Sequence, residues 1–313
     1  MTDAAKPSTP KTALARFLDS DLWWSFTHSP VVMVAALVTV VMILSAVFAP
    51  WVAPHDPFDL ASLDLMDSLK PPAWMEGGDP RYWLGTDDQG RDIFSTILYG
   101  ARISLLVGFL SVILAMLIGV AVGLVAGYFG GITDAVLMRI ADIQLTFPAI
   151  LIALLVDGVM RGILPPGAHE QVALFVLVLA IALSHWVQYA RTVRSSAMVE
   201  RNKEYVQAAR VIGLPAPLIL VRHILPNVMG PVLVIATIQL ALAIIIEATL
   251  SFLGVGVPPT SPSLGTLIRI GNDYLFSGEW WITVFPGLAL IILVLAVNLL
   301  GDWLRDALNP KLR

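Results

Sequence analysis

Long apolar stretches alternate with polar segments along the chain, and six of these stretches are long enough to cross a membrane. A helix rises about 1.5 Å per residue, so a hydrocarbon core of about 30 Å requires about 20 mostly apolar residues. The sequence therefore predicts an all-α integral membrane protein with six transmembrane helices. The predicted spans are Val31 to Val52, Ile103 to Gly127, Ala135 to Val156, Gln171 to Tyr189, Pro231 to Phe252 and Trp281 to Leu300.

Composition supports the same class of protein. Of the 313 residues, 57% are hydrophobic and 13% are charged, whereas a soluble domain carries about 25% charged residues. The net charge of −4 provides no basic surface for nucleic acid. The chain contains no cysteine, which excludes disulfides, thiolate metal sites and a cysteine nucleophile. Membrane lipid is therefore the expected surrounding of most of the chain.

The distribution of lysine and arginine predicts how the chain is oriented. If both termini lie inside, the inner segments hold 13 of the 19 lysine and arginine residues and the outer segments hold six. Cytoplasmic loops carry an excess of these residues. Both termini are therefore predicted to be cytoplasmic, which agrees with an even number of spans.

These assignments divide the chain into segments. Residues 1–30 form a cytoplasmic tail, 31–52 the first transmembrane helix, and 53–102 an external segment. Residues 103–301 form a five-helix core that includes an inner loop at 190–229, and 302–313 form a second cytoplasmic tail. The two long polar segments, 53–102 and 190–229, are the first places to look for function.

The external segment is predicted to contain an amphipathic helix that begins at Thr86. Thr86 and Gln89 have the spacing of a capping box, and Asp87 in the first turn suits the helix dipole. Apolar residues recur at helical spacing from Ile93 onward, so the helix is expected to lie in the membrane interface. Arg91 and Asp92 belong to the same helix in this interpretation. A cation site formed by Asp87, Asp88 and Asp92 ranks below capping, because no glycine-bent loop of alternating oxygen ligands is present.

Three charged residues lie within predicted spans, where a charge at mid-membrane costs about 2.5–3.5 kcal/mol. Arg139 and Asp142 are three residues apart near the inner end of the third span, which favours an intrahelical or interhelical ion pair that holds packing over a gate that rearranges when ATP binds. Glu247 follows three isoleucines and is expected to face the bundle. It either meets a solute in the pathway or hydrogen-bonds to a neighbouring helix.

The inner loop is predicted to form a compact knob of two short helices. The first contains Glu204, Tyr205 and Arg210 and ends at Gly213, a suitable C-cap residue. The second, Leu218 to Leu225, includes Arg222 and is expected to end at Pro226. Ala208 and Ala209 would leave one face bare, so that the groove of another protein could approach closely.

This loop resembles the signature of ABC importer permeases, in which Glu-Ala-Ala is followed at fixed spacing by Gly and by Leu-Pro. Gln207-Ala208-Ala209, Gly213 and Leu225-Pro226 stand at those spacings, with Gln207 in place of the usual Glu and His223 where Ile is common. Further segments resemble dipeptide, oligopeptide and nickel permeases of the "C" type, nearest to the dipeptide branch. They are Leu84–Ser95, Tyr99–Leu105, Arg139–Asp142 with Phe147-Pro148, Glu247–Gly254 and Asn298–Pro310.

The resemblance implies the type I ABC importer permease fold in the bacterial inner membrane. It implies a second homologous permease chain in a heterodimer, two ATPase subunits that bind ATP and Mg, and an external substrate-binding protein that the 53–102 segment could contact. The chain itself has no P-loop and no expected catalytic residue, metal or cofactor. The implied function is ATP-driven import of dipeptides or short oligopeptides by alternating access. Glutathione, nickel chelates or another small solute remain alternatives, and a secondary transporter is a remote one.

Overall fold

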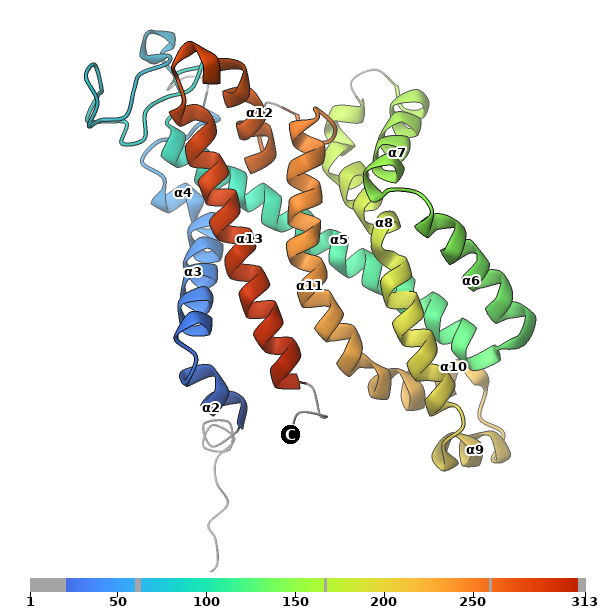
Figure 1. Ribbon diagram of the computed structural model, residues 1–313. Helices are drawn as coiled ribbons and strands as arrows, with labels where there is room; N and C mark the ends of the chain where they lie inside the picture. Colours follow the sequence, from blue (N-terminus) through green and yellow to red (C-terminus); the bar gives the residue numbers. More distant parts are fainter. Residues whose placement is uncertain (1–20, 60–62, 166–167, 259–260, 309–313) are drawn as a thin grey trace, which may run out of the picture.

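The computed structural model describes residues 21–59, 63–165, 168–258 and 261–308 of the chain (Figure 1). In these ranges the chain forms helices, turns and one isolated bridge between Thr86 and Asp92. The long helices are α3 (Pro30–Val47), α5 (Ile93–Phe129), α8 (Ala168–Glu200), α11 (Leu225–Phe252) and α13 (Trp281–Leu308). The shorter ones are α2 (Asp21–Thr27), α4 (Ala49–Val52), α6 (Gly131–Leu145), α7 (Ala149–Ile163), α9 (Glu204–Val211), α10 (Ala216–Ile219) and α12 (Leu264–Tyr274), with single turns at Leu65–Asp67, Leu220–Ile224 and Leu275–Ser277.

The helices form one bundle with a polar segment at each end. Figure 1 shows α5 crossing the bundle diagonally, with α3 and α13 on one side and α6 and α7 on the other. The polar segment 53–92, called the head segment below, lies at one end, and α9 projects from the other. Helix α2 and the end of α13 lie at the α9 end, where Trp303 Nε1 donates to Ser25 Oγ at 3.2 Å. The two described ends of the chain are therefore on the same side of the bundle.

Helix α5 packs along α8 through a row of glycines that sequence inspection had not singled out. Gly119, Gly123 and Gly127 recur every four residues and are all buried. A Cβ atom on Gly119 would lie 2.4 Å from Trp186 O, and one on Gly123 would lie 2.5 Å from Ala190 O. Small residues at this spacing let helix backbones approach closely in a membrane. The repeated Gly-x-x-x-Gly spacing was the sequence signal for this contact.

The predicted spans are correct in place but several are wrong in extent. Five helices are long and apolar enough to cross a membrane, and α6 with α7 makes up to six if that bent pair is one span. The third span is not straight, because α6 and α7 meet at 95°. Pro148 lacks a backbone N–H and disfavours helical geometry at Phe147, which explains the break. The fifth span is longer than predicted, since the apolar helical stretch runs from Ala216 to Phe252.

The ends of the chain also differ from the prediction. Helix α2 lies inside the predicted tail 1–30, and residues 1–20 of that tail lie outside the described ranges. The first span ends at Val47, after which Phe48 interrupts the helix and α4 begins at Ala49. Helix α13 continues to Leu308, so the tail predicted to start at residue 302 is helical over all of its described part. Residues 309–313 lie outside the description.

The predicted interfacial helix starting at Thr86 is wrong. Thr86 is fully buried in the head segment, where its hydroxyl donates to Asp67 O at 2.6 Å and accepts from Lys70 N at 2.8 Å. Its oxygen is therefore committed to tertiary contacts and does not cap a helix. Asp92 caps α5 instead, accepting from Ser95 N at 2.9 Å. The apolar residues from Ile93 onward are the buried first turns of α5 and do not form a separate helix.

Candidate functional site

Helix α9 of the inner loop ends in a Schellman motif centred on Gly213. Gly213 N donates to Arg210 O at 3.0 Å, and Leu214 N donates to Ala209 O at 3.1 Å. Gly213 has φ +80°, in the left-handed region that glycine adopts without strain. No other atom lies within 4 Å of the position of a Cβ on this residue. The glycine is required by backbone conformation and not by crowding, and the predicted C-cap is confirmed.

The knob is continuous with the core of the membrane bundle. Val206 and Ala209 of α9 are buried in one hydrophobic cluster with Ile219 and Ile224, and this cluster extends to Tyr189 of α8. A displacement of α9 therefore presses directly on side chains of the bundle, because a close-packed cluster transmits strain. The predicted bare alanine face is wrong in part. Ala208 is exposed, but the helical turn places Ala209 against the bundle.

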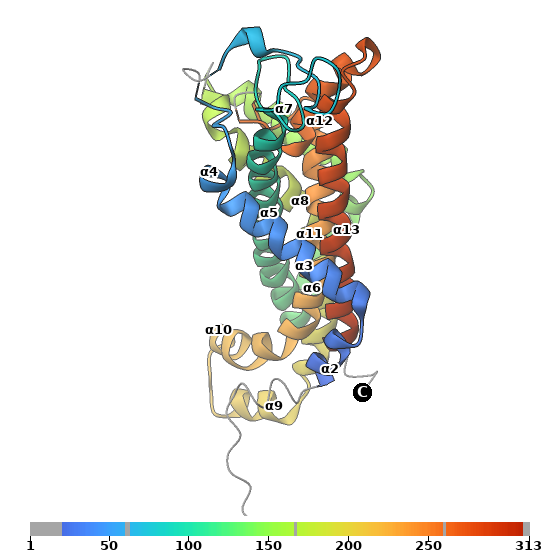
Figure 2. The same ribbon diagram turned by 90° about the vertical axis from the view of Figure 1, so that its left-hand side faces the viewer.

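The tip of the knob presents apolar side chains to its surroundings. Val211 is 86% exposed and Ile212 is 73% exposed, next to the chain reversal at Gly213. Glu204 and Gln207 lie on exposed positions of α9, and Gln207 Nε2 donates to Arg201 O at 3.1 Å. Figure 2 shows α9 and α10 projecting together from the end of the bundle. The arrangement offers a protruding edge that a partner protein can receive in a groove.

A polar cluster holds the knob to the two long helices that flank it. The Tyr205 hydroxyl donates to Glu200 at the end of α8, and Asn227 Nδ2 of α11 donates to the same hydroxyl at 3.2 Å. Asn227 Nδ2 also donates to His223 O at 2.7 Å, and Lys203 Nζ donates to Glu200 Oε1 at 2.6 Å. Burial, and then the neighbouring Glu200 carboxylate, raises the pKa of Tyr205 to about 12. Sequence reasoning had not identified Glu200 or Asn227 as partners of Tyr205.

The second half of the loop is not a separate short helix. Helix α10 passes through a π-helical turn at Leu220–Ile224 directly into α11, so Arg222 and Leu225 lie on a continuous helical path. The predicted stop at Pro226 is wrong, because Pro226 occupies the first turn of α11. Pro226 lacks a backbone N–H, and it directly follows the π-helical turn, where the hydrogen-bond ladder already changes register. The knob is thus joined to the fifth span without a flexible linker.

A row of polar contacts ties α6 to α8. Asp142 pairs with Arg191, and Arg194 Nη2 donates to Asp134 Oδ2 at 2.6 Å. Trp186 Nε1 donates to Gln144 Oε1 at 2.7 Å. The expected packing ion pair is confirmed for Asp142, between helices, but it does not include Arg139. Helical geometry turns Asp142 toward α8, and Arg139 is exposed with no ion pair among the described residues.

Glu247 lies in a buried polar cluster between α5, α11 and the start of α12. It is 0% exposed, and Ser251 Oγ donates to its Oε1 at 2.7 Å. Among the described residues its other oxygen, Oε2, is buried without a hydrogen-bond partner. The hydrogen bond to Ser251 lies within α11, so contact with a solute and hydrogen bonding to a neighbouring helix both stay predictions. Within this chain the carboxyl group is shielded from any solute.

The head segment is held by its own charge network. Asp67 accepts from Tyr82 OH at 2.7 Å, pairs with Lys70, and lies 3.3 Å from Arg81 Nη2. The hydrogen bond from Lys70, followed by that from Tyr82, lowers the pKa of Asp67. Hydrogen bonds from Arg81 lower the pKa of Asp79. Paired carboxylates of this kind make the segment a compact unit at neutral pH.

The acidic residues considered for a cation site are mostly engaged by the protein itself. Arg91 Nε donates to Asp87 Oδ2 at 2.6 Å, and both side chains are at most 2% exposed. Asp92 accepts from Ser95 at the start of α5. In the described part of the chain no group of three or more His, Cys, Asp or Glu side chains is placed to hold a metal ion.

An all-helical bundle of membrane-spanning length with a packed, protruding loop at one end defines a multi-pass transport permease. The chain belongs to the family described as the binding-protein-dependent transport system inner membrane component, which matches residues 119–313. Residues 19–72 match the N-terminal TM domain of oligopeptide transport permease C. It is therefore a permease subunit of the ABC transporter class, as its loop motif had indicated.

Similar proteins cover almost the whole chain. The di/tripeptide transport system permease protein DppC of Pseudomonas aeruginosa is 40% identical over 293 residues, covering 94% of this chain and 92% of its own. The dipeptide transport system permease protein DppC of Haemophilus influenzae is 38% identical and covers 100% of both chains. The oligopeptide transport system permease protein OppC of Bacillus subtilis is 38% identical, covering 99% and 94%.

Solved structures support the fold. A chain of the inward-facing MetNI methionine ABC transporter aligns with a TM-score of 0.51 at 20% identity, covering 68% of this chain and 96% of that chain. This likeness bears on the fold alone. It agrees with the type I importer permease fold expected from the loop motif.

Proposed function

We propose that this chain forms one half of the translocation pathway of an ATP-driven importer for dipeptides and short oligopeptides. Its partners are a second permease chain, two ATPase subunits that bind ATP and Mg, and an external substrate-binding protein. The observation that carries the proposal is the inner knob. A docking loop whose buried face is continuous with the bundle core has a clear purpose only if a partner moves it.

The substrate class rests on the full-length relatives. Proteins named for dipeptide, di/tripeptide and oligopeptide transport align over 94–100% of this chain at 38–40% identity. The same machinery could carry glutathione, a nickel chelate or another small solute, so these solutes belong in the test.

The mechanism we propose is alternating access. Nucleotide-driven closure of the ATPases moves the knob, and α11 follows because it is joined to the knob through a continuous helical path. The Asp142–Arg191 contact between α6 and α8 is a candidate for a gate contact that changes during this motion. Arg139 is exposed and is a candidate to pair with Asp142 in another conformational state of the transporter. A solute or nucleotide shifts the equilibrium only by its difference in affinity for the two states.

Orientation is part of the proposal. The excess of lysine and arginine on segments at the α9 end favours a cytoplasmic knob and cytoplasmic termini. The head segment then lies outside the inner membrane, where it could contact the binding protein. Deleting residues 58–70 from a folded complex should weaken binding-protein affinity, and an unchanged affinity would count against this contact.

The proposal is tested by reconstituting the co-expressed transporter in liposomes. ATPase activity and uptake are measured with dipeptides, tripeptides, longer peptides, glutathione and nickel–histidine. Uptake of short peptides that requires ATP supports the proposal and sets the length limit. ATP-driven uptake of another solute would replace the substrate but keep the mechanism, whereas uptake without any ATPase subunit would overturn the function.

A further inference from the structure

A groove between α3 and α5 combines apolar walls with a single cation at its end. It has a volume of about 520 Å³ and is lined by Ile43, Ala46 and Val47 of α3, by Leu240 of α11, and by α5 residues that begin with Arg102. The other α5 lining residues are Leu105, Leu106, Phe109 and Leu110. Leu106 is 46% exposed and Phe109 is 56% exposed, so the groove is open on the surface of the bundle.

The cation lies where a span meets the membrane interface. Arg102 immediately precedes the predicted second span, and Val47 ends α3 on the other wall of the groove. Val47 and Arg102 both line the groove, so Arg102 lies beside the end of the first membrane-spanning helix. Just beyond Val47, Trp51 is 80% exposed and Phe48 is 43% exposed, as aromatic residues at an interface are. From Arg102 to Leu110 the groove descends about 12 Å toward the middle of the membrane.

The charge of Arg102 acts on the nearby Tyr99 hydroxyl, without a hydrogen bond between the two side chains among the described residues. Arg102 is exposed, and within the described ranges its guanidinium makes no hydrogen bond or ion pair. The planar fork of donors on a guanidinium suits the two oxygens of a phosphate, which is the anion that membrane interfaces supply. Below it the groove accepts an aliphatic chain over a length of about 12 Å.

We propose that this groove binds one glycerophospholipid from the leaflet on the head-segment side. The phosphodiester lies on Arg102, and one acyl chain fills the groove between α3 and α5. A bound lipid would join α3, the first span, to the core of the permease by filling a gap that protein side chains leave open. The charge on the groove selects for a phosphate headgroup and against a neutral lipid.

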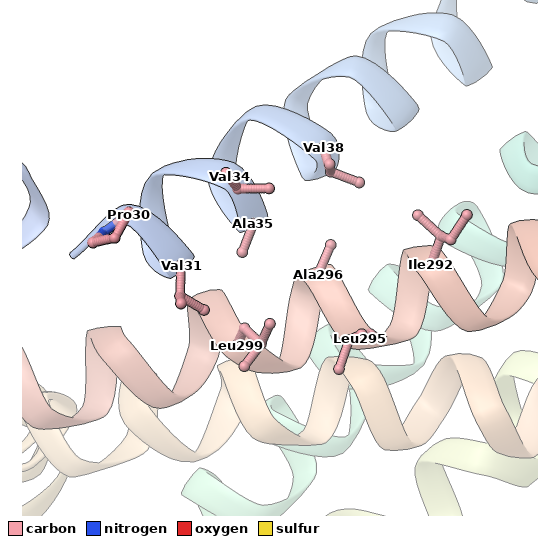
Figure 3. A pocket seen from close by; sticks show the side chains of 9 residues that line it. All are labelled: Pro30, Val31, Val34, Ala35, Val38, Ile292, Leu295, Ala296 and Leu299. Carbon is pink, nitrogen blue, oxygen red and sulfur yellow. The ribbon is translucent and has the colours of Figure 1, made fainter.

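A second groove on α3 provides an internal comparison. Figure 3 shows the space between α3 and α13, which has a volume of about 410 Å³ and is lined by nine residues. Val34 and Val38 of α3 face Ile292 and Ala296 of α13, and none of the nine lining residues is charged. Lipid chains that enter this groove have no headgroup contact, so they should exchange freely. Comparing the two grooves therefore distinguishes specific binding of a phospholipid headgroup from nonspecific contact with lipid chains.

The test measures phospholipid retained by the complete transporter after detergent exchange, with phosphatidylglycerol as the added lipid and native mass spectrometry as the readout. Wild type should retain one lipid more than Arg102→Gln, whose retention should be roughly tenfold weaker because a charge-assisted hydrogen bond is lost. Leu106→Trp should also lose the lipid by filling the groove. Arg305→Gln, at the other end of the bundle, and Val34→Trp, in the uncharged groove, should retain lipid like wild type.

Three results would overturn the proposal. One is equal retention by wild type and Arg102→Gln in complexes that elute as intact assemblies. Another is efficient cross-linking of the partner permease chain by a photoreactive maleimide attached to Leu106→Cys, since the groove would then be a protein interface. Retention of a neutral diacylglycerol as strongly as phosphatidylglycerol would also contradict the role assigned to Arg102.

Discussion

Trp281, the first residue of α13, donates a hydrogen bond from Nε1 to the carbonyl oxygen of Thr86, 195 residues earlier, at a distance of 3.1 Å. The indole also leaves no room for a side chain at Gly85, because a Cβ atom on Gly85 would lie 3.0 Å from Trp281 Nε1. Thr86 is in turn joined to Asp67 and Lys70 by its hydroxyl. One contact thus fixes the head segment to the start of the last span.

Removing the indole donor should loosen this end of the protein. Trp281→Phe keeps an aromatic ring but leaves the buried carbonyl of Thr86 without that donor, which should cost about 1 kcal/mol. We expect a lower thermal midpoint and faster trypsin cleavage after Lys70 and Arg81 in the purified complex. Trp280→Phe is the matched control, since it alters the neighbouring ring. Equal cleavage rates in the two variants would show that the hydrogen bond does not hold the head segment.

The head segment should also lose order in acid. Asp67 has a pKa below its ordinary value of 3.8, because Lys70 and Tyr82 hydrogen-bond to its carboxylate. A lowered pKa means that the pair stabilises the fold fully above about pH 3.8, and that this contribution disappears as pH falls through the folded-state pKa. Trypsin is inactive there, so pepsin cleavage between pH 5 and 2 is the appropriate measurement. The difference between wild type and Asp67→Asn should be constant above pH 4 and shrink below it.

Tyr205 should couple the knob to the bundle through its hydroxyl. Tyr205→Phe removes the bond to Glu200 and the acceptor for Asn227, which should cost about 1 kcal/mol. We expect ATP hydrolysis to continue while substrate-stimulated uptake falls several-fold. Because the pKa of Tyr205 is raised to about 12 from 10.0, the hydroxyl should contribute fully below pH 10. The stability difference between wild type and variant should therefore decline only from pH 10 upward.

Positions of the spans could be predicted from the sequence because about 20 apolar residues in a row have few other uses. The Gly213 cap was equally accessible, since a glycine with proline two residues on is a local signal. Helix ends that depend on tertiary contacts could not be predicted from the sequence. Thr86 has the spacing of a capping residue, yet its hydroxyl is taken by Asp67 and by Lys70, 19 and 16 residues away.

The same limit applies to charge pairs. An ion pair at Arg139 or Asp142 could be expected from the sequence, but whether it forms within a helix or between helices could not. The structure pairs Asp142 with Arg191, which is 49 residues away. Likewise Glu200 and Asn227 can be recognised as hydrogen-bond partners of Tyr205 only when the positions of α8 and α11 are known. Pairing across helices is set by packing, which a single sequence does not display.

Close packing of α5 on α8 should make Gly123 intolerant of even a methyl group. A Cβ atom there would lie 2.5 Å from Ala190 O, so Gly123→Ala should cost about 1–3 kcal/mol through overpacking. Gly287→Ala in α13 is the matched control, because no atom lies within 4 Å of its Cβ position. We expect the first variant to lower the thermal midpoint and the yield of assembled transporter, and the second to leave both unchanged or raised. A stable Gly123→Ala complex would mean that α5 and α8 are further apart than described.

Substitutions at Gly213 test whether the knob couples ATP hydrolysis to uptake, because alanine and proline should affect the chain reversal after α9 differently. Gly213→Ala keeps the N–H bond to Arg210 O but places a Cβ at φ +80°, which costs about 1–2 kcal/mol. Gly213→Pro removes that N–H and cannot adopt a positive φ, so the chain reversal after α9 must be rebuilt. The apolar tip at Val211 and Ile212 would then point elsewhere, while the spans are untouched. We expect normal membrane insertion for both variants, partly reduced uptake for alanine, and for proline an ATPase activity that no longer responds to substrate. Uptake by the proline variant at the wild-type rate would sink the assignment of this loop as the coupling element.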